Sequence, residues 1–286
     1  MPELPEVETM RRGIAGIAGS TIIAAARLPC LRKPIRIEPR PAVLSRRLVG
    51  RRIEEVGRLG KRVVLRLDSQ DRLIFEPRMT GLVLRADPPS VEHLRFRLDL
   101  SGGSIPHIWY WDRRGLGSVR LISERQLSEQ LGAGRLGPDA LALAAAELQL
   151  RLGNSRRAIK VALLDQRAVA GIGNLYASEI LHLAGIHPGK RCDLLAPRHW
   201  QAIHARMLQV LHEAILHEGS TLSDGTYRNA LNQAGGYQNQ HRVYDRAGEA
   251  CRQCQRTAIV RVVQAQRATF FCPSCQPKRS RKLSDQ

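Results

Sequence analysis

The sequence predicts an α+β protein with several domains, and three observations support this fold class. Residues 93–100 alternate strictly, with Leu94, Phe96, Leu98 and Leu100 on one face, which is the pattern of a half-buried strand. Three glycines and a proline fall within residues 132–138, and beyond them the hydrophobic period changes from that of strands to that of helices. Two Cys-x2-Cys pairs stand near the C-terminus. We therefore predict a β-rich domain, then a helical domain, then a small cysteine-containing module.

The first domain is predicted to span residues 1–131. Early prolines, acids in the first turn and an apolar face of Val7, Met10 and Ile14 predict an N-terminal helix that ends near residues 16–19. Short apolar runs at 62–67, 73–75 and 82–84 are separated by turn-rich segments. This succession predicts an antiparallel β-sandwich with the first helix packed beside it.

The second domain, residues 138–235, is predicted to be helical. We expect helices at 141–152 and 158–164, and a long helix whose apolar stripe runs from Trp200 to Ala214. Between them, Gly171 and Gly173 form a tight turn that leads into Asn174, which we expect to be a helix N-cap. Free backbone N–H groups at such a helix start attract a phosphate.

The cysteine pairs predict a metal site within a module that spans residues 242–276. Seventeen residues separate Cys251-x2-Cys254 from Cys272-x2-Cys275, which is a spacing typical of a four-cysteine zinc ribbon. Residues 259–263 and 268–271 are predicted to be the two strands of a hairpin. Four cysteine ligands leave no open coordination position, so we expect one structural Zn²⁺ rather than a catalytic one.

The charge predicts an anionic polymer as partner. The chain has 286 residues, a formal charge of +19 and a pI near 10.8, which favours nucleic acid through attraction to phosphates. A hydrophobic content of 43% excludes a disordered basic arm, although residues 277–286 are expected to be a flexible basic tail. No apolar run approaches the ~20 residues of a transmembrane helix, and the acidic start is no signal peptide. We therefore expect a cytoplasmic protein without membrane contact.

The chain start also predicts chemistry. Removal of Met1 would leave Pro2 with a free secondary amine, and a free α-amino group titrates near ~8, so part of it is nucleophilic at neutral pH. Such an amine can form a Schiff base with an electrophilic carbon. Glu3, Glu6 and Glu8 follow closely and could transfer protons, although the same residues also suit a purely structural helix start.

The whole string Met-Pro-Glu-Leu-Pro-Glu-Val-Glu-Thr resembles the N-terminus of the formamidopyrimidine-DNA glycosylases, bacterial enzymes that excise oxidised purines such as 8-oxoguanine. Gly-Ile-Gly-Asn-Leu-Tyr-Ala-Ser-Glu at 171–179 resembles the helix-two-turn-helix segment of the same family. Four separate blocks between residues 2 and 275 follow the family's order. The resemblance thus implies that the helical domain is a helix-two-turn-helix domain and that the cysteine module is the family's zinc finger.

The resemblance also implies catalytic roles. Pro2 would be the Schiff-base nucleophile, Glu3 the proton donor, and Glu6 the group that organises the amine. Lys61 matches a catalytically important lysine and would donate a proton during β-elimination. Arg267, expected near the hairpin tip, matches an arginine that grips the phosphates around the lesion, and would serve δ-elimination.

Further residues match DNA-contacting positions. His93, Lys160 and Asn174 match phosphate contacts, whereas Met79 and Arg114 match side chains that fill the gap left by the extruded nucleotide. The chain departs from the family in three places: Gly115 replaces an arginine, Leu116 takes the place of a phenylalanine, and Ser223 stands where a lysine or arginine is usual. Leu116 can still wedge between bases.

The resemblance, together with these residues, implies a bifunctional DNA glycosylase and AP lyase for oxidised purines in base excision repair. Its partner would be damaged double-stranded DNA; we expect a monomer in the bacterial cytoplasm, associated with the nucleoid when bound. Two alternatives stay open. A sibling activity on oxidised pyrimidines is disfavoured by Leu4, because that branch usually has Pro-Glu-Gly-Pro-Glu. A non-catalytic zinc-ribbon DNA-binding protein is disfavoured by the set of Pro2, Glu3 and Lys61.

Overall fold

The computed structural model describes residues 2–278, which fall into two compact units. Unit 1 contains residues up to 135 together with residues 214–238, and unit 2 contains residues 136–213 together with those from 239 onward. The sequence places residues 214–235 in the helical domain, but they pack with unit 1. Backbone pairing is one reason, because the N–H of Arg85 donates to the carbonyl of Ala230 at 2.9 Å.

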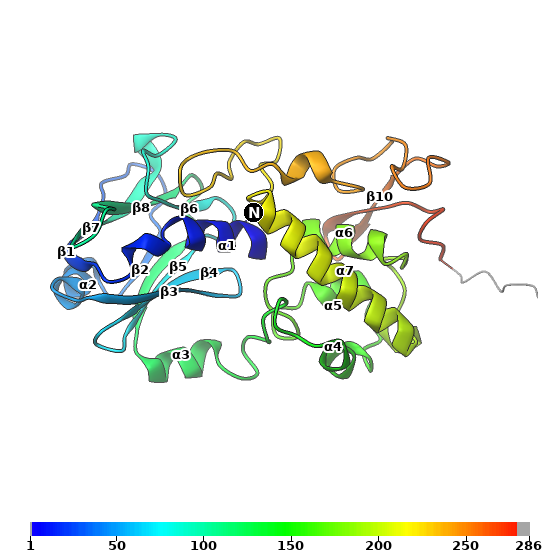
Figure 1. Cartoon of the computed structure of the whole chain (residues 1–286), viewed down its shortest axis with the longest axis horizontal. Helices are drawn as coiled ribbons and strands as arrows, with labels where there is room; N and C mark the ends of the chain where they lie inside the picture. The colour runs from blue at the N-terminus through cyan, green and yellow to red at the C-terminus, as the bar shows by residue number, and fades with distance from the viewer. Residues whose placement is uncertain (1, 279–286) are drawn as a thin grey trace, which may run out of the picture. The chain divides into compact units, whose positions relative to one another are not determined.

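Unit 1 is the predicted helix-plus-sandwich domain. It begins with α1 (Leu4–Gly13), which is labelled in Figure 1, followed by a 3₁₀ helix, η1 (Ala15–Ile17). One sheet has the order β1-β7-β8-β6 and the other has the order β2-β9-β5-β4-β3. Their strands are β1 (Thr21–Arg27), β2 (Arg36–Glu38), β3 (Ile53–Leu59), β4 (Arg62–Leu67), β5 (Arg72–Glu76), β6 (Gly81–Leu84), β7 (Leu94–Ser101), β8 (His107–Asp112) and β9 (Ser118–Ile122). Neighbouring strands are antiparallel except β2 and β9, which pair in parallel.

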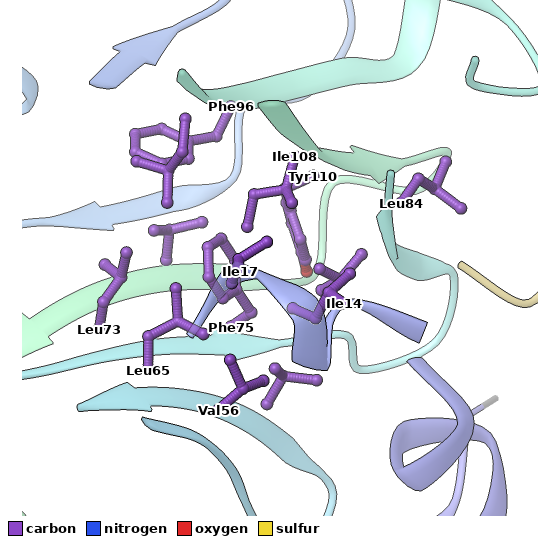
Figure 2. Packing of buried hydrophobic residues seen from close by; sticks show 14 of the residues in the cluster. Ile14, Ile17, Val56, Leu65, Leu73, Phe75, Leu84, Phe96, Ile108 and Tyr110 are labelled. Atoms are coloured by element: carbon purple, nitrogen blue, oxygen red, sulfur yellow. The ribbon is translucent and has the colours of Figure 1, made fainter. Parts of the chain in front are cut away.

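The core of unit 1 lies between the two sheets. Figure 2 shows side chains from both, such as Phe75 and Phe96, pointing toward one another beside Ile14 and Ile17. The alternating strand predicted at 93–100 is confirmed from residue 94 onward, since its four apolar side chains are buried in β7. Helix α1 packs against β3, β4 and β6, and Met10 Sδ accepts a hydrogen bond from Val83 N at 3.2 Å. The sandwich therefore holds α1, and with it the chain start, in a fixed position.

Unit 1 also contains short helices that the hydrophobic pattern did not indicate. These are α2 (Pro41–Leu48), η2 (Val91–His93) and α3 (Glu124–Leu131). His93 therefore ends a 3₁₀ helix rather than beginning the strand. Helix α3 buries none of its residues, and it starts at a Ser123 capping box, so local hydrogen bonds rather than burial define it.

Unit 2 is helical and ends in a two-stranded hairpin. Its elements are α4 (Ala145–Leu152), α5 (Ile159–Leu163), α6 (Asn174–Leu183), η3 (Cys192–Leu194), α7 (Pro197–Leu216), η4 (Tyr237–Gln240), β10 (Val260–Gln264) and β11 (Arg267–Phe271), and α7 and η4 each extend into unit 1. The apolar stripe of α7 is buried, as predicted, and its largest member is Trp200. Across residues 2–278, no helix has the length and apolar character that crossing a membrane requires.

Two local predictions in unit 2 were wrong. Residues 141–144 are not helical, because Asp139 forms a turn there: its side chain accepts from Leu141 N at 3.1 Å and its carbonyl accepts from Leu143 N. Asn174 is the first residue of α6, and the N-cap is Gly173. The Asn174 side chain is therefore available for other contacts, which are described below.

Candidate active site and nucleic-acid interface

The predicted nucleophile lies at the buried start of α1. Pro2 is buried, and Glu3 is only 4% exposed although it carries a carboxyl group. Pro5 lies in the first turn of the helix, where its missing N–H costs nothing. The N–H of Glu3 donates to Glu6 Oε2 at 2.8 Å, so the backbone beside Pro2 is held by a side chain one turn further along. Met1 lies outside the described residues.

Glu6 links the chain start to the segment that follows α7. Its second carboxylate oxygen, Oε1, accepts the N–H of Ser220 at 2.9 Å. Gly219 has a φ of +79°, and a Cβ there would lie 2.9 Å from Glu6 Cγ, so only glycine fits. The buried Tyr227 hydroxyl donates to the carbonyl of Glu218 at 2.9 Å and lies 3.4 Å from that of Glu6. Glu6 thus holds the backbone beside Pro2, and its predicted role in organising the amine stays a prediction.

Glu8 is an ion-pair centre. Burial alone would raise its pKa, but hydrogen bonds from Arg11, Arg12 and Arg58 outweigh that effect and lower the pKa to about 2. A carboxyl group with so low a pKa stays ionised near neutral pH. Glu8 is therefore unsuited to donating protons.

Lys61 occupies the turn between β3 and β4, and Arg58 connects this turn to α1. Lys61 is half-buried and follows Gly60, which has a φ of +56°. Arg58 Nε donates to Glu8 Oε2 at 3.1 Å, while Arg58 Nη1 donates to the carbonyl of Gly60 at 2.9 Å. One arginine thus fixes the Lys61 turn relative to the helix that begins beside Pro2.

The predicted gap-filling side chains stand on two surface turns of unit 1. Met79 is 37% exposed and Leu116 is 38% exposed. Arg114 is exposed in the same loop as Leu116. Exposure of this kind fits side chains that enter a partner.

His93 is mostly buried. Its ring lies edge-on to Trp111, with centroids 5.4 Å apart, and Nε2 lies 3.0 Å from Glu92 Oε1. Burial lowers the pKa of His93; the Glu92 carboxylate opposes this shift, and nearby arginines add to it. His93 is therefore neutral near pH 7, which leaves it one N–H to donate.

In unit 2, Lys160 and Asn174 hold the hairpin. Lys160 has no exposed surface, and its Nζ donates to Asn174 Oδ1 at 2.5 Å, to the carbonyl of Ala268 at 3.0 Å and to Thr269 Oγ1 at 2.8 Å. Asn174 Nδ2 also donates to the Ala268 carbonyl, at 2.9 Å. These contacts fix the backbone directly after Arg267. A direct contact of Lys160 with phosphate stays a prediction, and its burial favours a positioning role.

Arg267 lies at the hairpin tip, as the sequence predicts. It is the exposed first residue of β11 and pairs with Gln264 across the hairpin. The tip itself is Ala265-Gln266, and both residues have positive φ angles. A rigid two-residue turn therefore presents the Arg267 side chain to solvent.

A buried glutamate on α6 anchors the chain that leads into the cysteine module. Glu179 has no exposed surface, and its Oε1 accepts from Val243 N at 2.9 Å and from Tyr244 N at 2.8 Å. Arg242, paired with Glu213 at 2.9 Å, contributes its own N–H to Glu179 Oε2 at 2.9 Å. Sequence reasoning missed this role; the available signal was a lone acidic residue among the apolar residues of α6.

The four predicted metal ligands come together. The sulfur atoms of Cys251, Cys254, Cys272 and Cys275 all lie within 4.8 Å of one another. The Sγ atoms of Cys251 and Cys275 are 3.9 Å apart, and those of Cys254 and Cys272 are 3.6 Å apart. Tetrahedral zinc with bonds of ~2.3 Å requires sulfurs about 3.8 Å apart. The arrangement thus fits one structural Zn²⁺.

Comparison with protein families matches three consecutive parts of the chain. The formamidopyrimidine-DNA glycosylase N-terminal domain matches residues 1–119, and the H2TH domain of the same glycosylases matches residues 136–226. A zinc finger found in these glycosylases and in isoleucyl-tRNA synthetases matches residues 248–278. The chain belongs to the formamidopyrimidine-DNA glycosylase family. The predicted family, fold and structural zinc are confirmed.

Relatives support this assignment over the whole length. The formamidopyrimidine-DNA glycosylase of Chloroflexus aurantiacus is 43% identical and aligns over 96% of this chain and 98% of its own. The Bacillus subtilis enzyme is 35% identical, and the alignment covers 98% of this chain and 100% of the relative. The crystal structure of the MutM (Fpg) protein from Thermus thermophilus has a TM-score of 0.83 at 35% identity, covering 96% of this chain and 98% of its own. The Lactococcus lactis Fpg bound to abasic-site DNA has a TM-score of 0.84 at 32% identity, covering 96% and 100%.

Proposed function

We propose that the protein is a bifunctional DNA glycosylase and AP lyase that excises oxidised purines from duplex DNA during base excision repair. The observation that supports this most is the buried start of α1, where Pro2 and Glu3 stand together in a chain of this family. The Lactococcus lactis relatives were crystallised with DNA that contains Fapy-dG or an abasic site. The same kinds of damaged DNA are the proposed substrates here.

The chemistry begins with extrusion of the damaged nucleotide, because its sugar carbon is hidden inside the duplex. The nitrogen of Pro2 attacks C1′, the bond from C1′ to the damaged base breaks, and the departing base takes up the proton that the Pro2 nitrogen loses. Glu3 protonates the ring oxygen of the sugar, so that the ring opens and leaves an iminium linkage between Pro2 and C1′. Glu6 holds the backbone beside Pro2 during these steps, since its two oxygens bind Glu3 N and Ser220 N.

Strand cleavage follows from the iminium, which acidifies the C2′–H bond. Loss of that proton expels the 3′ phosphate by β-elimination, and a second elimination expels the 5′ phosphate. Lys61 is the proposed proton donor for the first step. Arg267 is proposed for the second, where its cation would also stabilise the departing phosphate.

The remaining candidates would bind DNA. His93 and Asn174 would contact phosphates. Lys160 would contribute to DNA binding by holding the hairpin that presents Arg267. Met79, Arg114 and Leu116 would fill the gap that the extruded nucleotide leaves in the duplex. The zinc ion, held by the four cysteines, would stabilise the hairpin without taking part in the chemistry. We also propose that the protein acts in the bacterial cytoplasm and associates with the nucleoid when bound to DNA.

Borohydride trapping tests this proposal. The protein would be incubated with duplexes containing 8-oxoguanine opposite cytosine, an oxidised pyrimidine or an abasic site, and the Schiff base would then be reduced. We expect a covalent complex that forms with the oxidised purine and disappears in Pro2→Gly. A larger yield of covalent complex with the oxidised pyrimidine would instead indicate a glycosylase for oxidised pyrimidines. DNA binding with no trapped species would support the zinc-ribbon DNA-binding alternative instead.

A further inference from the structure

Asp112, at the end of β8, binds two separate surface turns through one buried carboxylate. It has no exposed surface. Its Oδ1 accepts a short hydrogen bond from Thr80 Oγ1 and another from Arg114 N at 3.1 Å, while its Oδ2 accepts from Gly117 N at 2.8 Å. Thr80 Oγ1 also lies 3.0 Å from Arg114 N, so the three groups form one connected cluster.

The two turns are those that carry the proposed gap-filling side chains. Thr80 directly follows Met79 at the start of β6, and Arg114 and Gly117 stand on either side of Leu116. Met79 and Leu116 are more than a third exposed, although the adjacent Thr80 hydroxyl and the N–H groups of the Leu116 loop are bound to a fully buried carboxylate. The cluster thus fixes the bases of the turns and leaves their tips available.

Close packing supports both turns from behind. A Cβ on Gly81 or Gly117 would lie 2.5 or 1.8 Å from the Tyr110 hydroxyl, which itself donates to the carbonyl of Glu76 at 2.8 Å. The buried Arg95 donates through Nε to the backbone carbonyl of Asp112 at 2.8 Å. Neither turn has room to shift toward the sandwich.

The same packing explains why Gly115 stands where the family usually has an arginine. Gly115 has a φ of +62°, and a Cβ there would lie 2.2 Å from the carbonyl oxygen of Lys33. The segment between β1 and β2 therefore occupies the space that a side chain at 115 would need.

We infer that Asp112 is a positioning residue that holds Met79, Arg114 and Leu116 in one preformed arrangement before DNA binds. This inference rests on the proposed function, because the three side chains matter only if they enter a gap in duplex DNA. A preformed arrangement spares the ordering entropy that a mobile loop loses when it inserts. Schiff-base formation by Pro2 on single-stranded DNA, where no gap in a duplex has to be filled, does not need the Asp112 cluster.

Two variants and one control test the inference. Asp112→Asn keeps the size of the side chain, but its amide N–H₂ would face Arg114 N or Gly117 N, where only an acceptor fits. Thr80→Val removes the hydroxyl alone and leaves the two backbone contacts of Asp112 in place. Asp99→Asn is the control, because Asp99 pairs with Arg97 on β7 and contacts neither turn.

Single-turnover rates would be measured on an 8-oxoguanine duplex and on a single-stranded oligonucleotide with an abasic site. We expect Asp112→Asn to lower the duplex rate at least tenfold and Thr80→Val to lower it about threefold. Both should keep the single-strand lyase rate within about twofold of the wild type. 2-Aminopurine placed opposite an abasic analogue should show reduced unstacking in both variants, and Asp99→Asn should match the wild type.

If Asp112 had only a structural role, Asp112→Asn would lower the duplex rate and the single-strand lyase rate by the same factor, and this result would overturn the inference. A duplex rate equal to that of the wild type would also overturn it. If Asp112→Asn melts below the assay temperature, Thr80→Val decides between these outcomes. Failure of the proposed function is separate, since the wild type itself would then trap no DNA.

Discussion

Replacing Lys160 by methionine separates the two roles that this residue could have. Methionine has a similar length but no donor, so the change leaves Asn174 Oδ1, the Ala268 carbonyl and Thr269 Oγ1 without their shared partner. The hairpin backbone next to Arg267 then loses its link to α5. The cysteine cluster is not touched.

The size of the effect follows from these contacts. Hydrogen bonds to a charged donor contribute about 1.5–3 kcal/mol each and are not additive, and breaking a buried charged network costs about 3–5 kcal/mol. The apolar methionine side chain recovers about 1–2 kcal/mol through burial. We therefore expect Lys160→Met to lower the free energy of unfolding by about 3 kcal/mol.

Two assays would measure the outcome. Urea unfolding gives the stability, and hydrogen exchange at residues 267–271 shows whether the loss is local to the hairpin. DNA affinity measured across salt concentrations then counts phosphate contacts, because each contact contributes a slope of about 0.9 in log K against log salt. We expect the slope of Lys160→Met to change by less than half of that value.

Arg267→Met is the matched control. Arg267 is exposed at the hairpin tip, so its loss should flatten the slope by about 0.9 and leave stability within about 0.5 kcal/mol. If Lys160→Met instead flattened the slope by a full unit and kept wild-type stability, Lys160 would be a direct phosphate ligand and the positioning role would be refuted.

Three further predictions concern the chain start and the metal. Glu8 has a pKa of about 2, below its ordinary value of 4.5, so its ion pairs stabilise the fold fully above pH 4.5 and are lost as pH falls through 2. Glu8→Gln should therefore lower the free energy of unfolding, measured by chemical denaturation, by about 2–3 kcal/mol at pH 7. The difference in stability between this variant and the wild type should vanish toward pH 2. Glu129→Gln, which removes an exposed ion pair with Arg125, should lower the free energy of unfolding by less than about 0.5 kcal/mol. Gly219→Ala adds a Cβ 2.9 Å from Glu6 Cγ and should reduce borohydride trapping at least tenfold. Gly225 also has a positive φ, but a Cβ there would meet open space. Gly225→Ala should therefore lower the free energy of unfolding by only about 1–2 kcal/mol and leave trapping unchanged. Removal of zinc by a chelator should weaken duplex binding, measured by fluorescence anisotropy, and should reduce the δ-elimination that is assigned to Arg267 on the zinc-stabilised hairpin. The β-elimination on single strands that depends on Pro2 should persist, and its loss in step with duplex binding would contradict a purely structural metal.

Local patterns in the sequence were sufficient for much of this account. The alternation in β7 and the spacing of the four cysteines are local, and both predictions are confirmed. The cores of α5 and α7 also agree with their predicted ranges.

What the sequence could not supply are contacts between distant residues. Asp112 binds Thr80 from 32 positions away, Glu179 binds Val243 from 64, and Tyr227 lies against Glu6 from 221. None of these residues stands in a pattern that indicates its partner, because the fold alone brings them together. The non-helical residues 141–144 were missed for a related reason, since a single Asp139 turn outweighs their helical composition.

The central claim is that the amine of Pro2 forms the bond to DNA. The most direct test is mass spectrometry of the borohydride-trapped complex after nuclease and trypsin digestion, which should yield the N-terminal peptide of residues 2–11. We predict that this peptide begins at Pro2, without Met1, and carries the reduced sugar on its nitrogen. A sugar attached to Lys61 or to any other lysine, with an unmodified N-terminus, would contradict the account.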